Sequence, residues 1–302
     1  MNPILIHEVG PRDGLQAEGS VVPMEVKLDW LRRVAATGVD IVQVGSFVRG
    51  DKMPQMADTD ELFRILGREP HRALLSGLVL NEKGLERALE VGVQLVCLGV
   101  SASETHSRKN TAMGTEEATR RIIATALAAK QAGRKVQVSV QSAFGCGFEG
   151  AIPEARVMGI VAAYLEAGLT SISLADTAGH AHPAQVRRYV QAVLALDPAA
   201  EVTAHIHDTY GLGMASVYAA MKAGARAIET SFGGLGGCPF TKVAAGNVAT
   251  EDLVHGLQRV GQRMDIDLPA LIGVTREVAK YFDRELPGCV YKTGPIQAKA
   301  LA

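Results

Sequence analysis

Cysteine is scarce in this 302-residue chain, and net charge is almost absent. The four cysteines, Cys97, Cys146, Cys238 and Cys289, form no Cys-x-x-Cys pair. A short secreted chain held by disulfides would be denser in cysteine, so we expect free thiols in a reducing compartment. Lysine and arginine number 31 and aspartate and glutamate 32, which gives a formal charge of −1. This balance argues against a nucleic-acid-binding protein and against a polybasic membrane anchor.

The chain also has no long apolar run and no recognisable targeting segment. No run reaches the length of a membrane span, and Met1–Glu8 leads into a strand-like segment without a basic and apolar leader. We therefore expect a cytoplasmic protein with no membrane partner. Apolar residues make up 47% and charged residues 21%, which excludes disorder as the main state.

Strand-like and helix-like segments alternate along the chain. Short runs rich in valine, isoleucine and leucine predict buried strands at Ile4–Glu8, Ile41–Val44, Leu74–Leu80, Leu95–Val100, Val136–Val140, Ser171–Leu174, Val202–His207 and Ala227–Thr230. Amphipathic stretches between them predict helices at Met24–Thr37, Thr59–Leu66, Asn81–Val91, Thr115–Ala132, Pro153–Ala167, Pro183–Leu196, Met214–Ala223 and Thr250–Gln262. Glycines that typically end helices follow five of them, at Gly38, Gly92, Gly133, Gly168 and Gly224.

Eight strand–helix units in succession predict an α/β fold with a parallel sheet. The number of units favours a closed (β/α)8 TIM barrel, with an open doubly wound sheet as the alternative. No linker divides the chain, so we expect a single domain over residues 1–302. The barrel would occupy about residues 4–262, and a C-terminal extension, residues 263–302, would include an extra helix at Leu268–Tyr281.

Catalytic side chains of such barrels lie at the carboxyl ends of the strands, where this sequence places several polar residues. His205 and His207 are two residues apart on a predicted strand, so both point to the same face. They could share a metal ion or form a hydrogen-bonded pair. Asp13 and Asn247 would add a carboxylate and an amide oxygen, a set that suits Mg²⁺ or Mn²⁺ better than Zn²⁺. Their alternative roles are a turn residue before Gly14 and a helix cap.

Two further residues carry chemistry. Arg12 would place a guanidinium beside the metal, able to hold a carboxylate or a developing enolate oxygen, or it could form a surface salt bridge. Cys238 lies in the glycine-rich segment 233–240, either as an acid/base group or as a small buried residue. This segment is not a phosphate loop, because no Gly-Lys-Ser/Thr follows it.

Taken together, these motifs resemble the 3-hydroxy-3-methylglutaryl-CoA lyase family of metal-dependent TIM-barrel enzymes. The resemblance spans about residues 4 to 260. The matching stretches are EVGPRDGLQ at 8–16, SF at 46–47 with PQMAD at 54–58, SASE at 101–104, GC at 145–146 with EG at 149–150, ISLADTAG at 172–179, HIHDTYG at 205–211, GLGGCPF at 234–240 and GNVATEDLV at 246–254.

The resemblance implies a TIM barrel that cleaves a 3-hydroxyacyl-CoA by a retro-Claisen or retro-aldol reaction, giving acetyl-CoA and a keto compound. By position in the motifs, it implies a divalent metal held by Asp13, His205, His207 and Asn247. It implies that Arg12 stabilises the enolate, that Cys238 transfers a proton, and that Asp176 is an acid/base partner beside the substrate. Glu8 and Gln16 match supporting residues of the first loop, and Arg108, Lys109 and Asn110 match a basic stretch that would contact CoA or else form a solvated loop.

One position departs from the family. Where the lyase pattern has a catalytic glutamate on the second strand, this chain has Gln43. Glutamine keeps the shape and hydrogen bonds of glutamate but cannot carry charge or exchange a proton. The change suggests either a weak lyase or a related substrate, such as citramalyl-CoA, which would give pyruvate. The sequence leaves open a Claisen-type condensing transferase and a catalytically silent barrel as well, and we expect a homodimer.

Overall fold

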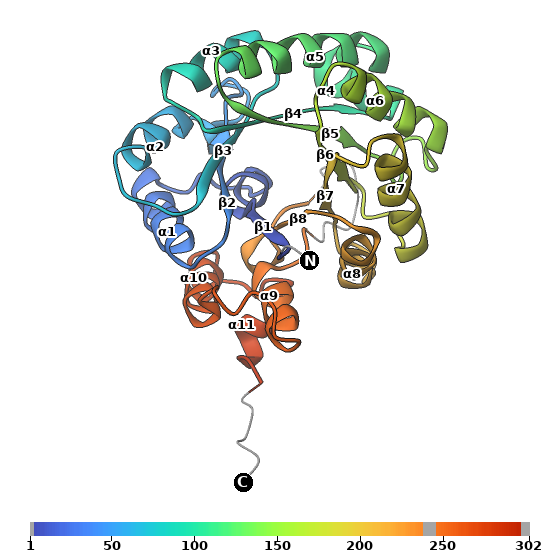
Figure 1. Ribbon diagram of the computed structural model, residues 1–302. Helices are drawn as coiled ribbons and strands as arrows, with labels where there is room; N and C mark the ends of the chain where they lie inside the picture. Colours follow the sequence, from blue (N-terminus) through green and yellow to red (C-terminus); the bar gives the residue numbers. More distant parts are fainter. Residues whose placement is uncertain (1–2, 238–245, 297–302) are drawn as a thin grey trace.

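A computed structural model of the chain describes residues 3–237 and 246–296. Eight parallel strands close into a barrel in sequence order, and helices surround them (Figure 1). The first and last strands pair directly, with Leu5 opposite Ala227. The predicted TIM barrel is therefore confirmed, and the open sheet is excluded because the ring closes.

The strands match the predicted segments to within a few residues. They are β1 (Leu5–Glu8), β2 (Ile41–Ser46), β3 (Leu74–Leu78), β4 (Leu95–Ser101), β5 (Lys135–Gln141), β6 (Ser171–Ala175), β7 (Glu201–His205) and β8 (Ala227–Thr230). The predicted seventh strand extended to His207, but β7 ends at His205, and His207 instead forms an isolated bridge with Asn247.

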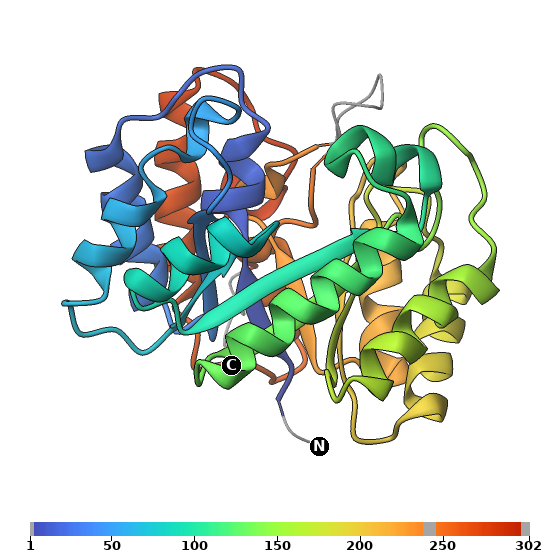
Figure 2. The ribbon, with the colours of Figure 1, turned by 90° about the horizontal axis from the view of Figure 1, so that it is seen from above.

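The helices that follow the strands lie outside the ring and run beside it (Figure 2). They are α1 (Met24–Ala36), α2 (Thr59–Leu66), α3 (Glu82–Glu90), α4 (Glu104–Thr111), α5 (Thr115–Gln131), α6 (Glu154–Glu166), α7 (Pro183–Leu196), α8 (Gly213–Ala223) and α9 (Thr250–Gln258). Asn81 caps α3 by accepting from the Gly84 amide at 3.0 Å. The five glycines predicted to end helices all adopt positive φ, at Gly38, Gly92, Gly133, Gly168 and Gly224.

The short helix α4 was not predicted from the sequence. It begins at a cap, because the Ser103 hydroxyl accepts from the His106 amide at 3.1 Å. Its sequence, ETHSRKNT, is polar almost throughout, so it lacks the apolar periodicity by which helices are recognised. It lies at the carboxyl end of β4, where it can contribute to the mouth of the barrel.

The C-terminal extension packs beside the last barrel helix. The predicted extra helix is α10 (Leu268–Tyr281), which Asp267 caps through the Ala270 amide. It contacts α1 and α9, and a short helix, α11 (Val290–Thr293), contacts α9 and α10 (Figure 1). The helix α11 falls in the tail for which the sequence predicts no structure. Asp252 anchors it by accepting from the amides of Cys289 and Val290.

Side chains alternate between the inside of the barrel and the layer beneath the helices. Residues that face the helices, such as Ile6, Val138 and Ile228, are apolar and fully buried. The middle of the barrel interior is polar instead, and several of its residues contact one another across the ring: His7, Gln43, Ser76, Gln137, Thr203 and Glu229. Branched apolar residues usually fill this space, so the polar interior is a particular feature of this barrel.

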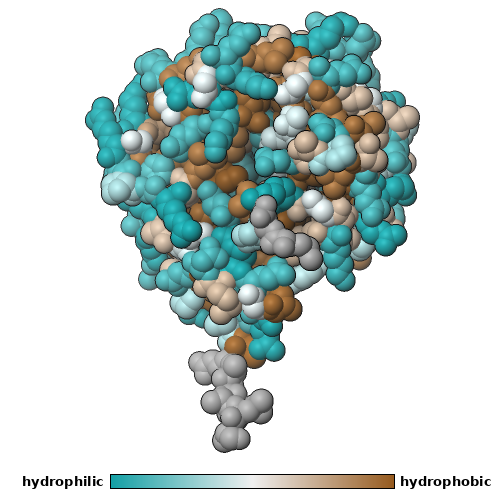
Figure 3. Space-filling model, viewed as in Figure 1, coloured by the Kyte–Doolittle hydropathy of each residue, from teal (hydrophilic) through white to brown (hydrophobic). Residues whose placement is uncertain are grey.

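On the face seen in Figure 3, hydrophilic side chains cover most of the outer helices, and hydrophobic ones show between them. Within the described residues, we find no helix with the length and apolar character needed to cross a membrane.

Candidate active site

The first part of the site is a π-helical turn, η1 (Gly10–Gly14), directly after β1. The Val9 carbonyl oxygen accepts from the amides of Arg12 at 3.1 Å and Asp13 at 2.7 Å. Gly10 permits this tight turn, because a Cβ there would lie 2.6 Å from a carboxylate oxygen of Glu8. The turn thus presents Arg12 and Asp13 at the mouth of the barrel.

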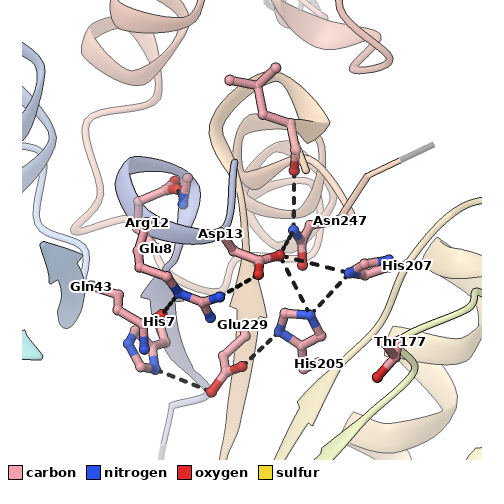
Figure 4. A network of polar contacts seen from close by, with 12 residues as sticks. His7, Glu8, Arg12, Asp13, Gln43, Thr177, His205, His207, Glu229 and Asn247 are labelled. Atoms are coloured by element: carbon pink, nitrogen blue, oxygen red, sulfur yellow. Dashed lines mark hydrogen bonds and ion pairs between the residues drawn. The ribbon is translucent and has the colours of Figure 1, made fainter. Parts of the chain in front are cut away.

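Three candidate metal ligands converge above the strand ends (Figure 4). The Nε2 atoms of His205 and His207 lie 3.1 Å apart. The Oδ2 atom of Asp13 lies 3.9 Å from the first and 3.8 Å from the second. One atom from each residue therefore falls within 4.8 Å of the other two, which is the spacing of a shared metal site.

Asn247 completes this cluster. Its side-chain nitrogen donates to Asp13 Oδ2 at 2.8 Å and to the Leu235 carbonyl oxygen at 3.1 Å. Its Oδ1 atom is buried and has no hydrogen-bond partner among the described residues. A buried oxygen without a partner is costly unless something else binds it, and a cation is a suitable partner. Two imidazoles, a carboxylate and this amide oxygen therefore fit a hard divalent cation such as Mg²⁺ or Mn²⁺.

The charges of the cluster favour an ionised carboxylate. Burial raises the pKa of Asp13, but the Arg12 charge and the hydrogen bond and charges of the two histidines outweigh it, so this pKa lies well below its ordinary value. Arg12 donates to Asp13 Oδ1 at 2.5 Å. The carboxylate oxygen that faces the histidines thus remains available as an anionic ligand.

Arg12 also binds the residue that departs from the family pattern. Its Nε donates to the side-chain oxygen of Gln43 on β2. A glutamate at position 43 would place an anion at this contact, whereas glutamine supplies a neutral acceptor. In this chain, Asp13 is therefore the charged partner of the guanidinium.

A cavity of about 380 Å³ opens beside the cluster. Its wall includes Gln16 and Asn110, both predicted site residues. Arg12, Gln43 and three members of the metal cluster, Asp13, His205 and His207, also line it. Apolar side chains such as Leu78 and Leu98 line another part. The cavity thus combines a polar, charged region with an apolar one, as a site for a small polar group on a longer acyl chain requires.

Glu8, predicted as a supporting residue of the first loop, does not line this cavity. Because His7 faces the barrel interior, Glu8 points to the opposite face of β1. It accepts there from the amides of Gly10 and Phe232 and from the Thr250 hydroxyl. Burial, only partly opposed by these hydrogen bonds, raises the pKa of Glu8 to about 7. Its contacts join η1 to the chain after β8.

Asp176 is likewise absent from the cavity wall. It is fully buried, and its two oxygens accept from the amides of His180 at 2.8 Å and Ala181 at 3.1 Å. Burial raises the pKa of Asp176, although the charge of His207 and these backbone hydrogen bonds oppose the rise. The structure therefore places Asp176 as a brace for the loop after β6, near His207.

The residues predicted to contact CoA separate in space. Arg108 pairs with Glu104 at 2.7 Å, and its side chain is 65% exposed. The Lys109 ammonium lies 4.9 Å from the centre of the Phe148 ring. Asn110 reaches the cavity wall, while the other two lie outside it. Cys238, the predicted proton-transfer residue, lies outside the described residues.

Sequence reasoning missed two buried residues next to the cluster. Glu229 accepts from His205 Nδ1 at 2.7 Å, and its other oxygen lies 3.5 Å from Nδ1 of His7. Burial raises the pKa of Glu229, but hydrogen bonds and charges from both histidines hold it far below its ordinary value. The available signal was the strand alternation, because the residues before them, Ile6 and Ile228, are apolar and face the helices.

The comparisons with known proteins agree with this geometry. The family model HMGL-like matches residues 3–278. The chain belongs to the HMGL-like family. A hydroxymethylglutaryl-CoA lyase of Bacillus subtilis is 35% identical over 284 residues, which cover 94% of this chain and 95% of the relative. An (R)-citramalyl-CoA lyase of Chloroflexus aurantiacus is 35% identical over 311 residues, covering 100% and 98%.

Solved structures show the same HMGL-like fold. An HMG-CoA lyase from Acinetobacter baumannii, in complex with coenzyme A and 3-methylmalate, superposes with a TM-score of 0.91 at 37% identity. The match covers 98% of this chain and 97% of that one. The family and the lyase activity that the sequence motifs imply are thereby confirmed.

Proposed function

We propose that this HMGL-like protein is a divalent-metal-dependent carbon–carbon lyase that cleaves a short 3-hydroxyacyl-CoA with a free carboxylate. The products are acetyl-CoA and a keto acid. The observation that carries the proposal is the convergence of Asp13, His205 and His207 at the mouth of the barrel, with the buried Oδ1 of Asn247 beside them.

Cleavage of the C2–C3 bond requires transfer of the 3-hydroxyl proton to a base, the role that the sequence motifs assign to Asp176, while C2 departs as an enolate. A divalent cation held by Asp13, His205, His207 and Asn247 would supply a Lewis acid that acidifies this hydroxyl and fixes its orientation. Two N–H groups of Arg12 bind Gln43 and Asp13. The remaining guanidinium N–H groups can donate to the thioester oxygen, where the negative charge of the enolate develops.

A proton must then reach C2 of the enolate. We assign this step to the thiol of Cys238 on the basis of its position in the glycine-rich motif. Gln43 cannot perform it, because a glutamine side chain does not exchange a proton at neutral pH. The role of Gln43 is therefore to hold the Nε of Arg12, and thus the orientation of the guanidinium.

Two substrates fit this chemistry. In hydroxymethylglutaryl-CoA, one methylene separates the free carboxylate from the carbinol carbon, whereas in citramalyl-CoA the carboxylate is attached directly. Because Gln43 is neutral, it does not offset the positive charge of Arg12. This charge can then attract a carboxylate close to the reacting carbon. This favours citramalyl-CoA as the second candidate. The relative that cleaves citramalyl-CoA and the neighbour that binds 3-methylmalate support it.

The decisive experiment measures acetyl-CoA release with Mg²⁺ and with Mn²⁺ from both substrates in parallel. Release from hydroxymethylglutaryl-CoA, lost in Cys238→Ala, would show that the site tolerates Gln43. Release mainly from citramalyl-CoA would show that the specificity has shifted. Silence on both, with Mn²⁺ bound, would contradict the proposal in favour of a non-catalytic barrel. Release of free CoA from acetyl-CoA plus a keto acid would indicate a condensing enzyme instead.

We also propose that the enzyme works as a homodimer in the cytoplasm. The thiols of Cys97, Cys146 and Cys289 are free, which suits a reducing compartment. Light scattering after size-exclusion chromatography tests the dimer, and a mass near 31.9 kDa would contradict it. Fractionation of the cells that produce the protein tests its location.

A further inference from the structure

A chain of buried polar groups runs from the metal cluster into the barrel. His205 Nδ1 lies 2.7 Å from Glu229, which lies 3.5 Å from His7, whose Nε2 lies 2.8 Å from the Ser76 hydroxyl. All four residues are buried. Figure 4 shows Glu229 between the imidazoles of His7 and His205.

Strand register produces this arrangement. Glu229 on β8 is the register partner of His205 on β7 and of His7 on β1. Side chains at such positions lie on the same face of a sheet, so closure of the barrel places the carboxylate between the two rings. No movement of a loop is needed, because each residue belongs to a strand.

The hydrogen atoms in this chain can be assigned from its partners. The Ser76 hydroxyl has one hydrogen, which can go to the Val42 carbonyl oxygen at 3.3 Å or to His7 Nε2. If Ser76 donates to His7, then Nδ1 of His7 carries the hydrogen that faces Glu229. With that tautomer, Nδ1 of His7 directs its hydrogen toward Glu229 at 3.5 Å, a weaker contact than a hydrogen bond.

Glu229 thus accepts from His205 Nδ1 at 2.7 Å and faces Nδ1 of His7 at 3.5 Å on its other side. This fixes the Nδ1 hydrogen of His205 and leaves the Nε2 lone pair directed into the metal cluster. His207 has no equivalent support, because its Nδ1 is buried without a hydrogen-bond partner among the described residues. The two histidines are therefore unequal, and His205 is the better oriented ligand.

We propose that Glu229 and His7 form a positioning pair that orients His205 and thereby sets the metal affinity of the site. The inference rests on the proposed metal-dependent function. Groups that hold the second nitrogen of a metal-binding histidine typically change metal affinity 10- to 100-fold when they are removed. His7 acts only through Glu229, since it does not contact His205.

The test measures Mn²⁺ binding by electron paramagnetic resonance, which counts free ions and needs no turnover. We expect Glu229→Leu to raise the dissociation constant of Mn²⁺ by about 10- to 100-fold. Glu229→Gln keeps the volume of the side chain and guards against misfolding. It should raise the dissociation constant of Mn²⁺ by a smaller factor than Glu229→Leu does, because a neutral amide still fixes the Nδ1 hydrogen of His205, but less firmly than a carboxylate. Ser173→Ala, which removes another buried hydroxyl of the same barrel, is the matched control and should bind Mn²⁺ as the wild type does.

A double-mutant cycle separates positioning from general packing. His7→Leu should weaken Mn²⁺ binding in the wild-type background and have little further effect in Glu229→Gln, because its influence passes through the carboxylate. If His7→Leu weakens Mn²⁺ binding by the same factor in the wild type and in Glu229→Gln, the two residues act independently and the pairing is overturned. An unchanged dissociation constant in both Glu229 variants would overturn the whole inference.

The same measurement on Asp13→Ala tells this failure apart from failure of the proposed function. If the wild type binds Mn²⁺ and Asp13→Ala does not, the metal site stands, and the Glu229 and His7 variants alone decide the positioning pair. If Asp13→Ala binds Mn²⁺ as well as the wild type does, the metal site itself is wrong, and the positioning pair falls with it.

Discussion

The Nε2 atoms of His205 and His207 face each other across 3.1 Å at the mouth of the barrel. Because Glu229 accepts from the other nitrogen of His205, the facing nitrogen of His205 presents a lone pair. A proton or a cation between the two rings is needed to make this approach favourable. Asp13 Oδ2 lies within 4 Å of both nitrogens, so the fold itself creates a place for positive charge.

Metal removal should therefore lower stability. We expect Mn²⁺ at about 100 times its dissociation constant to raise the free energy of unfolding by about 2.7 kcal/mol. An excess of EDTA should reverse the effect. Differential scanning calorimetry with and without the ion measures it, and Asp13→Ala is the control that should show no increase. An equal increase in Asp13→Ala would place the ion elsewhere on the protein.

Arg12 should be needed for its shape as well as for its charge. The guanidinium donates at once to Gln43 and to Asp13, whereas a lysine ammonium cannot reproduce this planar fork. We expect Arg12→Lys and Arg12→Gln both to lower kcat about 10²- to 10³-fold. Steady-state kinetics checks this, with the exposed Arg120→Gln as the matched control. Near-wild-type turnover in Arg12→Lys would show that only the positive charge of Arg12 matters, and not the shape of its guanidinium.

The barrel could be predicted because its signals are local. Short apolar strands, amphipathic helices and glycines past the helix ends recur along the chain, and the structure follows them closely. The grouping of Asp13 with His205 and His207 was predictable for a related reason: each follows or ends a strand, and the carboxyl ends of parallel strands meet at one face of a barrel. The polar helix α4 was not predicted, because it has no apolar periodicity and its only sequence signal is the cap at Ser103.

The pairing of His7 with Glu229 could not be predicted, since it depends on which strands become neighbours when the ring closes and on their register. Glu8 was predicted only as a supporting residue of the first loop. Its partners Phe232 and Thr250 could not be predicted, because they come from the far end of the chain. The contacts of Asp176 could not be predicted either, because a carboxylate after a strand can bind backbone amides of its own loop.

Restoring the family acid should change substrate preference. Gln43→Glu would place a carboxylate next to the Nε of Arg12. Its negative charge would offset the positive charge that attracts the substrate carboxylate. We expect the ratio of kcat/KM for citramalyl-CoA to kcat/KM for hydroxymethylglutaryl-CoA to fall by about tenfold, equivalent to about 1.4 kcal/mol. Gln16→Glu adds a carboxylate elsewhere on the cavity wall and is the matched control for charge. An unchanged ratio in Gln43→Glu would remove residue 43 as a determinant of specificity.

Glu251 should make stability depend on pH. It is fully buried and accepts from the Gly233 amide at 3.1 Å, and burial, with smaller contributions from the charges of Asp252 and Glu8, raises its pKa to about 8. The folded state thus holds a proton that the unfolded state releases above about pH 4.5, so this group lowers stability as pH rises from about 4.5 to 8. Glu251→Gln cannot ionise, so it does not lose stability through this titration. Its melting temperature should therefore rise relative to that of the wild type across this range, by about 2–4 °C for each kcal/mol that the wild type loses. Thermal melts from pH 5 to 9 measure this rise.

The exposed Glu86→Gln is the control, and its melting temperature should follow that of the wild type at every pH. If the melting temperature of Glu251→Gln also follows that of the wild type, Glu251 stays ionised in the folded protein.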